Sequence, residues 1–194
     1  MATYLAPIEK PRGLLLKLVY YFTRRMFGTV STPIAVFSAR MPRAFLMFYG
    51  KVSSLDKKLT LPRQTVILVR ERVASINGCL YCMDASRWYA LTKSPDVLPK
   101  LDALAEYVTS PLFTPAERAA LGYVSELVEH RSVSPATFAE LSRHYSEREI
   151  CDIVWLVASE HVYNMTNIGL GIGSDGLCER QAARGDTSVA ATAG

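Results

Sequence analysis

The stretch INGCLYCMDASRWYAL, residues 76–91, decides how the rest of the chain is interpreted. Asn77-Gly78 favours a break between two helices, because glycine readily adopts the left-handed backbone that ends a helix. Cys79 and Cys82 follow at C-x-x-C spacing. If a second helix begins near Cys79, the two thiols lie three positions apart and share one face of it. The sequence therefore predicts a helical hairpin with a pair of thiols at its bend.

Thiols in the first turn of a helix lie near unpaired backbone N–H groups and the positive end of the helix dipole. Both favour the thiolate, and Ser86 falls one turn further along the same face. Two thiols at this spacing can also close a disulfide. The alternatives are two small apolar side chains at a packed helix start, or half of a zinc site. Cys151 and Cys178 would have to complete that site, and their spacing matches no zinc finger or ribbon.

The composition suits one domain of ordinary size or two small lobes. The chain has 194 residues, and 49% of them are hydrophobic, enough for a sizeable core. A net charge of +4 is too small to predict binding to nucleic acid. Four cysteines are too few for a secreted disulfide scaffold of this length, and no signal peptide is apparent, so we expect a cytoplasmic location. The apolar run 14–27 is too short to span a bilayer, so no transmembrane segment is expected.

The predicted organisation has three parts. Residues 1–29 form an arm and an amphipathic helix, residues 30–178 a helical domain, and residues 179–194 a disordered tail. Residues of the first helix follow the three- and four-residue spacing of an apolar face: Leu15, Leu18, Val19, Phe22 and Met26. We expect this face to pack on a partner helix or subunit. A position on a membrane surface is the alternative, because basic residues flank the face.

No segment shows the alternating pattern of a strand, so the fold class is predicted to be all-α. Two capping boxes, Thr114-Pro115-x-Glu117 and Ser146-x-x-Glu149, predict where two of the longest helices begin. About eight helices result, joined by short connections, around a central hairpin formed by helices 62–76 and 79–91. Cys151, in the first turn of the last helix, is assigned to the core.

Several segments together resemble a known family. Residues 61–62, 66–69 and 76–82 are similar to the core motif of the alkylhydroperoxidase D-like and carboxymuconolactone decarboxylase-like proteins. The segment ARMPRAFLMFYG, residues 39–50, resembles the part that precedes this motif. Residues 113–126 and 138–156 resemble the second helical lobe, and Tyr163-Asn164 resembles an aromatic-asparagine element near the end. The resemblance extends over roughly residues 30–175.

The resemblance implies an all-α helical bundle and homo-oligomers, which are trimers, hexamers or dimers in different branches. It also implies a redox role in which Cys82 attacks a peroxide and Cys79 resolves the sulfenic acid as a disulfide. A dithiol reductant protein would then restore the pair. No cofactor and no metal are implied. The predicted function is therefore that of a thiol-disulfide redox protein with peroxide-reducing activity.

Two residues depart from the family's peroxidase motif. The motif places a glutamate at position 67 and a histidine at position 86, where this chain has Ile67 and Ser86. Serine can hydrogen-bond a thiolate but cannot shuttle a proton near pH 7 as histidine does. We therefore expect weakened peroxidase activity, with Glu71 as a candidate substitute carboxylate. The alternatives are a non-catalytic binding or regulatory scaffold, and a decarboxylase-like enzyme with Trp88 or Tyr89 near its pocket wall.

Overall fold

The computed structural model describes residues 3–183, and these residues form helices and connections without any strand. This confirms the predicted all-α class. No helix among them is long and apolar enough to cross a membrane. The α-helices are α1 (Leu14–Phe27), α2 (Pro42–Phe45), α3 (Ser53–Asp56), α4 (Arg63–Asn77), α5 (Leu80–Lys93), α6 (Leu98–Asp102), α7 (Pro115–His130), α8 (Pro135–Ser142) and α9 (Glu147–Ile168). The π-helices are η1 (Ile34–Ser38) and η2 (Leu46–Val52), and the 3₁₀ turns are η3 (Pro95–Val97) and η4 (Leu104–Glu106).

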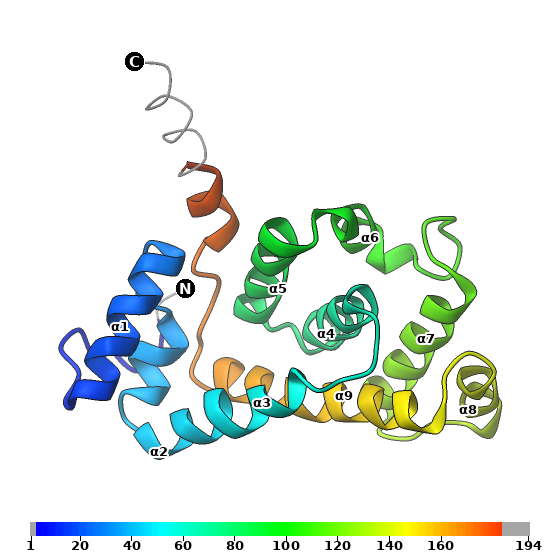
Figure 1. Ribbon diagram of the computed structural model, residues 1–194, viewed down its shortest axis with the longest axis horizontal. Coiled ribbons are helices and arrows are strands. Elements are labelled where there is room, and N and C mark those ends of the chain that lie inside the picture. The colour runs from blue at the N-terminus through cyan, green and yellow to red at the C-terminus, as the bar shows by residue number, and fades with distance from the viewer. Residues whose placement is uncertain (1–2, 184–194) are drawn as a thin grey trace.

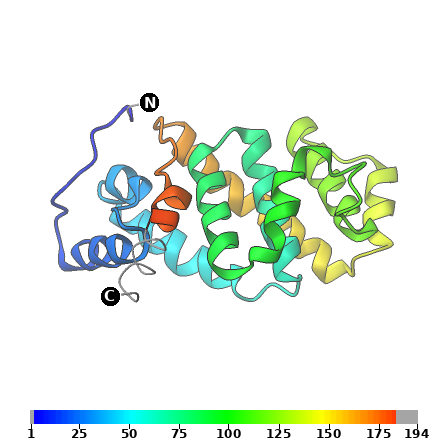
Figure 2. The ribbon, with the colours of Figure 1, turned by 90° about the horizontal axis from the view of Figure 1, so that it is seen from above.

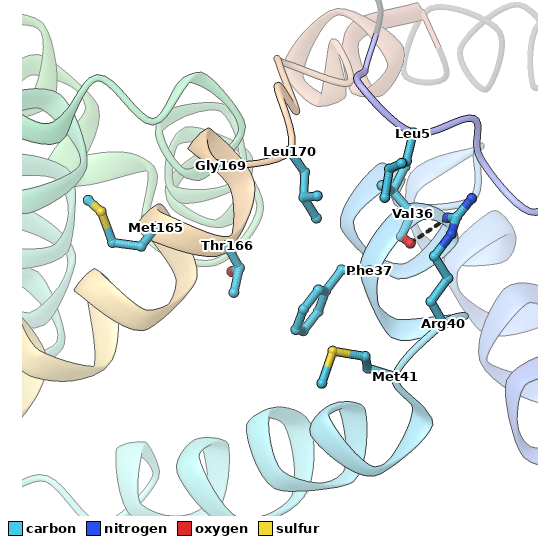
Figure 3. A pocket seen from close by; sticks show the side chains of 9 residues that line it. All are labelled: Leu5, Val36, Phe37, Arg40, Met41, Met165, Thr166, Gly169 and Leu170. Atoms are coloured by element: carbon cyan, nitrogen blue, oxygen red, sulfur yellow. Dashed lines mark hydrogen bonds between the residues drawn. The ribbon is translucent and has the colours of Figure 1, made fainter.

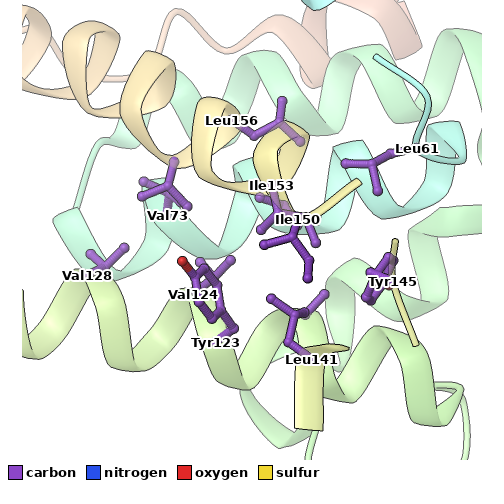
Figure 4. Packing of buried hydrophobic residues seen from close by; sticks show 13 residues of the cluster. Leu61, Val73, Tyr123, Val124, Val128, Leu141, Tyr145, Ile150, Ile153 and Leu156 are labelled. Atoms are coloured by element: carbon purple, nitrogen blue, oxygen red, sulfur yellow. The ribbon is translucent and has the colours of Figure 1, made fainter. Parts of the chain in front are cut away.

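Helix α4 lies at the centre of the bundle, where it contacts α5, α7 and α9 (Figure 1). The long helix α9 runs beneath it, and α1 and α8 lie at opposite ends of the molecule (Figures 1 and 2). The main core fills the space between α4, α7 and α9 with side chains such as Val73, Val124 and Ile153 (Figure 4). All three are fully buried.

Both predicted capping boxes are present. The Thr114 side chain accepts a hydrogen bond from the Glu117 backbone N–H, and the Glu117 carboxylate accepts one from the Thr114 N–H. Ser146 and Glu149 form the same reciprocal pair at the start of α9. These local contacts satisfy backbone donors that a helix start leaves unpaired, so the sequence alone identifies the two helix beginnings.

The hairpin also forms as predicted, with ends displaced by one or two residues. Gly78 ends α4 with a φ of 71°, a left-handed conformation that costs glycine little. Its N–H bonds to Ser75, and the Cys79 N–H bonds to the Ala74 carbonyl. Cys79 is the N-cap of α5, so the chain turns directly into the second helix.

Helix α1 is amphipathic, but its apolar face points outward. Leu16, Tyr20 and Thr23 face the protein and are buried. The opposite side exposes large apolar side chains, including Leu18 at 47% and Phe22 at 60%. The apolar periodicity predicted the helix correctly, whereas the side that packs on the domain carries a tyrosine and a threonine. Much of the outer face, including Leu18 and Phe22, is therefore exposed.

Two further expectations differ from the structure. Cys151 was assigned to the core and is exposed, because α9 buries the neighbouring Ile150 and Ile153 instead. Residues 177–183 are helical, although the tail was expected to be disordered from residue 179. This segment is held to α5 by Asp84, whose carboxylate accepts hydrogen bonds from the Leu177 N–H and the Ser174 hydroxyl. Residues 184–194 of the expected tail lie outside the described residues.

Candidate redox site

Cys79 and Cys82 are joined by a disulfide, with their Cα atoms 5.3 Å apart. The pair lies between the end of α4 and the first turn of α5, packed against Ala74 and the partly buried Tyr163. Cys79 is 1% exposed and Cys82 is 8% exposed. Cys178 and Cys151 are free thiols. The chain therefore brings together the two cysteines of the C-x-x-C motif as a buried disulfide.

Two asparagine amides of α9 point at the sulfur atoms. The Asn164 Nδ2 donates to Cys82 Sγ at 3.1 Å. The Asn167 Nδ2 lies 3.4 Å from Cys82 Sγ and 3.7 Å from Cys79 Sγ. Both asparagines are buried, at 0% and 4% exposure. In the sequence, Asn164 stands out only within the family resemblance and Asn167 not at all; their three-residue spacing on an apolar helix is the signal that could place both on one face.

The orientation of the Asn164 amide is set by its other partners. Its Oδ1 accepts a hydrogen bond from Asn77 Nδ2 at 2.8 Å. Its Nδ2 also donates to Glu160 Oε1 at 2.8 Å. A carboxylate only accepts hydrogen bonds, so the amide nitrogen must face Glu160, and its second hydrogen is left for Cys82. Asn77, read from the sequence as a turn residue, thus also aligns a group on α9.

Glu160 is a buried carboxyl that the sequence analysis did not select. Burial raises its pKa, and the charge of Arg70 and the hydrogen bond from Asn164 offset part of this effect. The Arg70 guanidinium lies 3.6 Å from Glu160 and 2.6 Å from Asp56. Asp56 also accepts a hydrogen bond from the indole N–H of Trp155. A connected polar network therefore extends from Cys82 through Asn164 to the outer edge of α9.

Glu71, the candidate substitute carboxylate, is buried on α4 with 1% exposure. Burial raises its pKa to about 7, while the Ser86 hydroxyl and the Arg87 guanidinium lower it in part and Glu160 raises it further. Arg87 Nε lies 3.4 Å from Glu71 Oε1. Oε2 has no hydrogen-bond partner among the described residues. The structure thus places a carboxyl that titrates near neutral pH beside Ser86, one helical turn from Cys82.

Ile67, at the position of the family's glutamate, lies in a different environment. It is 4% exposed and belongs to an apolar cluster with Leu68, Ala90 and Leu101. Position 67 is one turn before Glu71 on α4, and Ala90 is one turn beyond Ser86 on α5. The two helices therefore pair Glu71 with Ser86 and Ile67 with Ala90. The carboxyl at position 71 is the one that faces Ser86.

A hollow of about 380 Å³ lies beyond α9, on the side away from the disulfide. Phe37, Thr166 and Leu170 point into it from η1 and from the end of α9 (Figure 3). Phe37 stacks on Phe48, which contacts Tyr163 edge-on, and Tyr163 packs against the cysteines. A chain of aromatic contacts therefore links the wall of the hollow to the cysteine pair.

The aromatic residues expected near a pocket wall lie elsewhere. Trp88 packs edge-on against Phe27 of α1, with ring centroids 4.7 Å apart. Tyr89 is 41% exposed. Neither lines the hollow beyond α9. Trp88 thus connects α5 to the N-terminal helix and takes no part in the pocket.

Comparison with known proteins identifies relatives along almost the whole chain. The uncharacterized protein YnjA of Escherichia coli (strain K12) is 30% identical over 183 residues, which cover 90% of this chain and 95% of YnjA. No protein-family model matches the sequence.

Among solved structures, a variant of the debrominase Bmp8 in complex with 2,3,4-tribromopyrrole aligns with a TM-score of 0.76 at 21% identity. The alignment covers 96% of this chain and 98% of Bmp8. An alkylhydroperoxidase AhpD core protein of Ralstonia eutropha JMP134, described as peroxidase-related, aligns with a TM-score of 0.69 at 20% identity. This alignment covers 82% of this chain and 85% of the Ralstonia protein. These likenesses establish the AhpD-like fold.

Proposed function

Because this chain belongs to the same family as YnjA and has the AhpD-like fold, we propose that it is a thiol-disulfide oxidoreductase that reduces peroxides. Cys82 is the attacking thiol, and Cys79 is the resolving thiol. One observation carries the proposal: Ser86 lies one helical turn beyond Cys82 of the buried Cys79–Cys82 pair, and the carboxyl beside Ser86, Glu71, has a pKa raised to about 7. A purely structural disulfide has no need of a neighbouring carboxyl that titrates near neutral pH.

The reaction begins with the pair as a dithiol. The Cys82 thiolate attacks one peroxide oxygen, the O–O bond breaks, and the departing alkoxide takes a proton to leave as an alcohol. Cys82 is then a sulfenic acid. The Cys79 sulfur attacks the Cys82 sulfur, the S–O bond breaks, and water leaves as the disulfide forms. The protein loses two electrons, and the peroxide gains them.

Glu71 would act as the general base and general acid of this cycle. A carboxyl whose pKa lies near the working pH can both accept and donate a proton. Ser86 lies between Glu71 and the first turn of α5, where its hydroxyl can pass a hydrogen bond but carries no charge. The Cys82 proton would move toward Glu71 as the thiolate forms and return to the alkoxide. This arrangement replaces the glutamate and histidine of the family motif with Glu71 and Ser86.

The disulfide returns to the dithiol by exchange with a second dithiol. Cys82 is the more exposed residue of the pair, at 8% against 1% for Cys79, so we expect an incoming thiolate to reach Cys82 first. The mixed disulfide forms on Cys82, and the second thiol of the donor displaces it. We therefore propose a dithiol protein as the reducing partner.

The test follows the pair directly. Reduced protein, freed of excess reductant, receives one equivalent of hydrogen peroxide or cumene hydroperoxide, and mass spectrometry follows formation of the Cys79–Cys82 disulfide. We expect one disulfide per peroxide consumed, with one alcohol released from cumene hydroperoxide and only water from hydrogen peroxide. The Cys79→Ser variant should stop at the Cys82 sulfenic acid, which dimedone traps. The Cys82→Ser variant should not consume the peroxide.

Two results would overturn the proposal in different directions. A dithiol that remains reduced under excess peroxide would favour the non-catalytic scaffold. A dithiol that is oxidised by 2,3,4-tribromopyrrole but not by peroxide would favour reductive dehalogenation. Brominated pyrroles are the second candidate substrate because the fold resembles that of the debrominase Bmp8. In that reaction the dithiol becomes a disulfide, bromide leaves, and hydrogen replaces bromine on the ring.

A further inference from the structure

We infer that Asn164 and Asn167 are positioning residues that select Cys82 as the reactive thiol, because their amide N–H groups stabilise negative charge on its sulfur. The inference rests on the proposed function only in requiring that the pair exists as a dithiol. It concerns which of the two sulfurs carries the charge, and it holds whether the oxidant is a peroxide or another acceptor.

The two sulfur atoms receive unequal donors. Cys82 Sγ lies 3.1 Å from Asn164 Nδ2 and 3.4 Å from Asn167 Nδ2. Cys79 Sγ has one amide neighbour, Asn167 Nδ2, at 3.7 Å. A hydrogen bond to an ionised acceptor is stronger than one to a neutral acceptor, so two amides favour the thiolate over the thiol. Cys82 is therefore the better place for negative charge.

The helix start favours negative charge on both sulfurs, because Cys79 is the N-cap of α5 and Cys82 is its third residue. The difference between the two cysteines therefore rests on the asparagine amides. The nearest ionisable group of the polar network, Glu160, is held away from the sulfur by the intervening Asn164 amide. Arg70 lies 3.6 Å from that carboxylate and offsets its charge. Negative charge on Glu160 therefore opposes the thiolate less than its proximity alone would suggest.

A substitution at Asn167 can distinguish hydrogen bonding to sulfur from simple structural support. Asn164 also joins Asn77 to Glu160, so its removal would disturb contacts that hold α4 and α9 together. Both hydrogen bonds formed by the Asn167 amide nitrogen among the described residues end on sulfur. A change at Asn167 consequently tests the donor to sulfur while the Glu160 network stays in place.

The experiment measures the rate of alkylation of Cys82 in the reduced full-length chain across a range of pH, with peptide mapping to separate it from the other cysteines. We expect Asn167→Leu and Asn167→Asp to lower the rate at neutral pH by about tenfold, the loss that follows a one-unit upward displacement of the profile. The rates should converge with those of the parent protein at high pH, where the thiol is ionised in every variant.

The matched control is Thr166→Val, one residue earlier on α9. The Thr166 hydroxyl donates to backbone carbonyls of its own helix and lies on the hollow side, away from sulfur. Its pH profile should match that of the parent. Asn167→Ser provides a smaller change if the larger variants do not fold.

An unchanged midpoint in a folded Asn167 variant would overturn the inference, as would a parent protein in which Cys79 is alkylated faster than Cys82. Failure of the proposed function is distinguishable from both. Suppose that the parent protein is not oxidised by peroxide, yet the Asn167 variants show the expected displacement in the pH profile of Cys82 alkylation. The inference would then stand and the peroxidase proposal would be wrong.

Discussion

Replacing Glu71 by glutamine should make the protein more stable above neutral pH and less active. The pKa of the Glu71 carboxyl rises from an ordinary 4.5 to about 7 because the folded chain buries it. Each pKa unit corresponds to about 1.4 kcal/mol, so ionising Glu71 costs the folded state about 3 kcal/mol. Glutamine fills nearly the same space and cannot ionise, so the variant does not incur this cost.

The sign of the pH dependence follows from the raised pKa. The folded carboxyl holds its proton more tightly than the unfolded one, so Glu71 contributes its full stability below about pH 4.5. This contribution is lost as pH rises toward about 7 and stays lost above that. The stability difference between Glu71→Gln and the parent should therefore grow across this window and then become constant. Arg87 keeps a partner in the variant, because it also pairs with Asp102 at 2.7 Å.

Urea denaturation at several pH values between 4.5 and 8.5, on reduced and on oxidised protein, measures this difference. Glu106→Gln, at an exposed position, is the matched control and should show no such trend. The same Glu71→Gln protein should oxidise its thiol pair with peroxide roughly 100-fold more slowly at neutral pH, the usual contribution of a general acid-base group. A variant that is equally stable at every pH would refute the burial argument, and an unchanged peroxide rate would refute the catalytic role.

Three further predictions follow from the same structure. Ser86→His should raise the peroxide rate roughly 100-fold in the presence of native Glu71, because the imidazole can then carry the proton between Cys82 and the carboxyl; single-turnover oxidation measures it, and no increase in a folded variant would contradict it. Ile153→Ala should lower the free energy of unfolding by about 2–5 kcal/mol, measurable in urea, because it empties part of a fully buried site. Leu18→Asp on the outer face of α1 should shift the protein toward monomer in analytical ultracentrifugation, and a parent protein already monomeric at micromolar concentration would rule out self-association through this face.

The parts of the fold that sequence could predict depend on local contacts. The capping boxes at Thr114 and Ser146 are formed by residues three positions apart, so the sequence contains both partners of each hydrogen bond. The hairpin bend likewise depends on Gly78, whose left-handed backbone is favoured by its residue type. The C-x-x-C spacing was sufficient to bring Cys79 and Cys82 together. Each of these features is determined within a few residues of chain.

The features that sequence could not predict depend on how distant helices pack. Apolar periodicity identifies an amphipathic helix over 14–27 but does not say whether its apolar face meets this chain or another molecule, and here it points outward. Cys151 is exposed because neighbouring isoleucines occupy the core side of α9. Glu160 and Asn167 become part of the site only when α9 packs against the hairpin. The three-residue spacing of Asn164 and Asn167 places them on one face of α9, but a single sequence does not say what that face contacts.

The position of the acidic residue shows how packing decides a chemical role. By alignment with the family motif, Ile67 occupies the site of the acid, and the relay would be judged absent. The structure shows that the neighbour of Ser86 on α4 is Glu71, four residues later, and that Ile67 packs one turn away against Ala90. Four residues are close to one helical turn, so positions 67 and 71 lie on the same face of α4, the one that meets α5. Because helical faces repeat in this way, a search for the acid should extend one turn to either side of the motif position. Placing glutamate at position 67 should therefore bury a charge in an apolar cluster and leave the rate of thiol oxidation by peroxide unchanged.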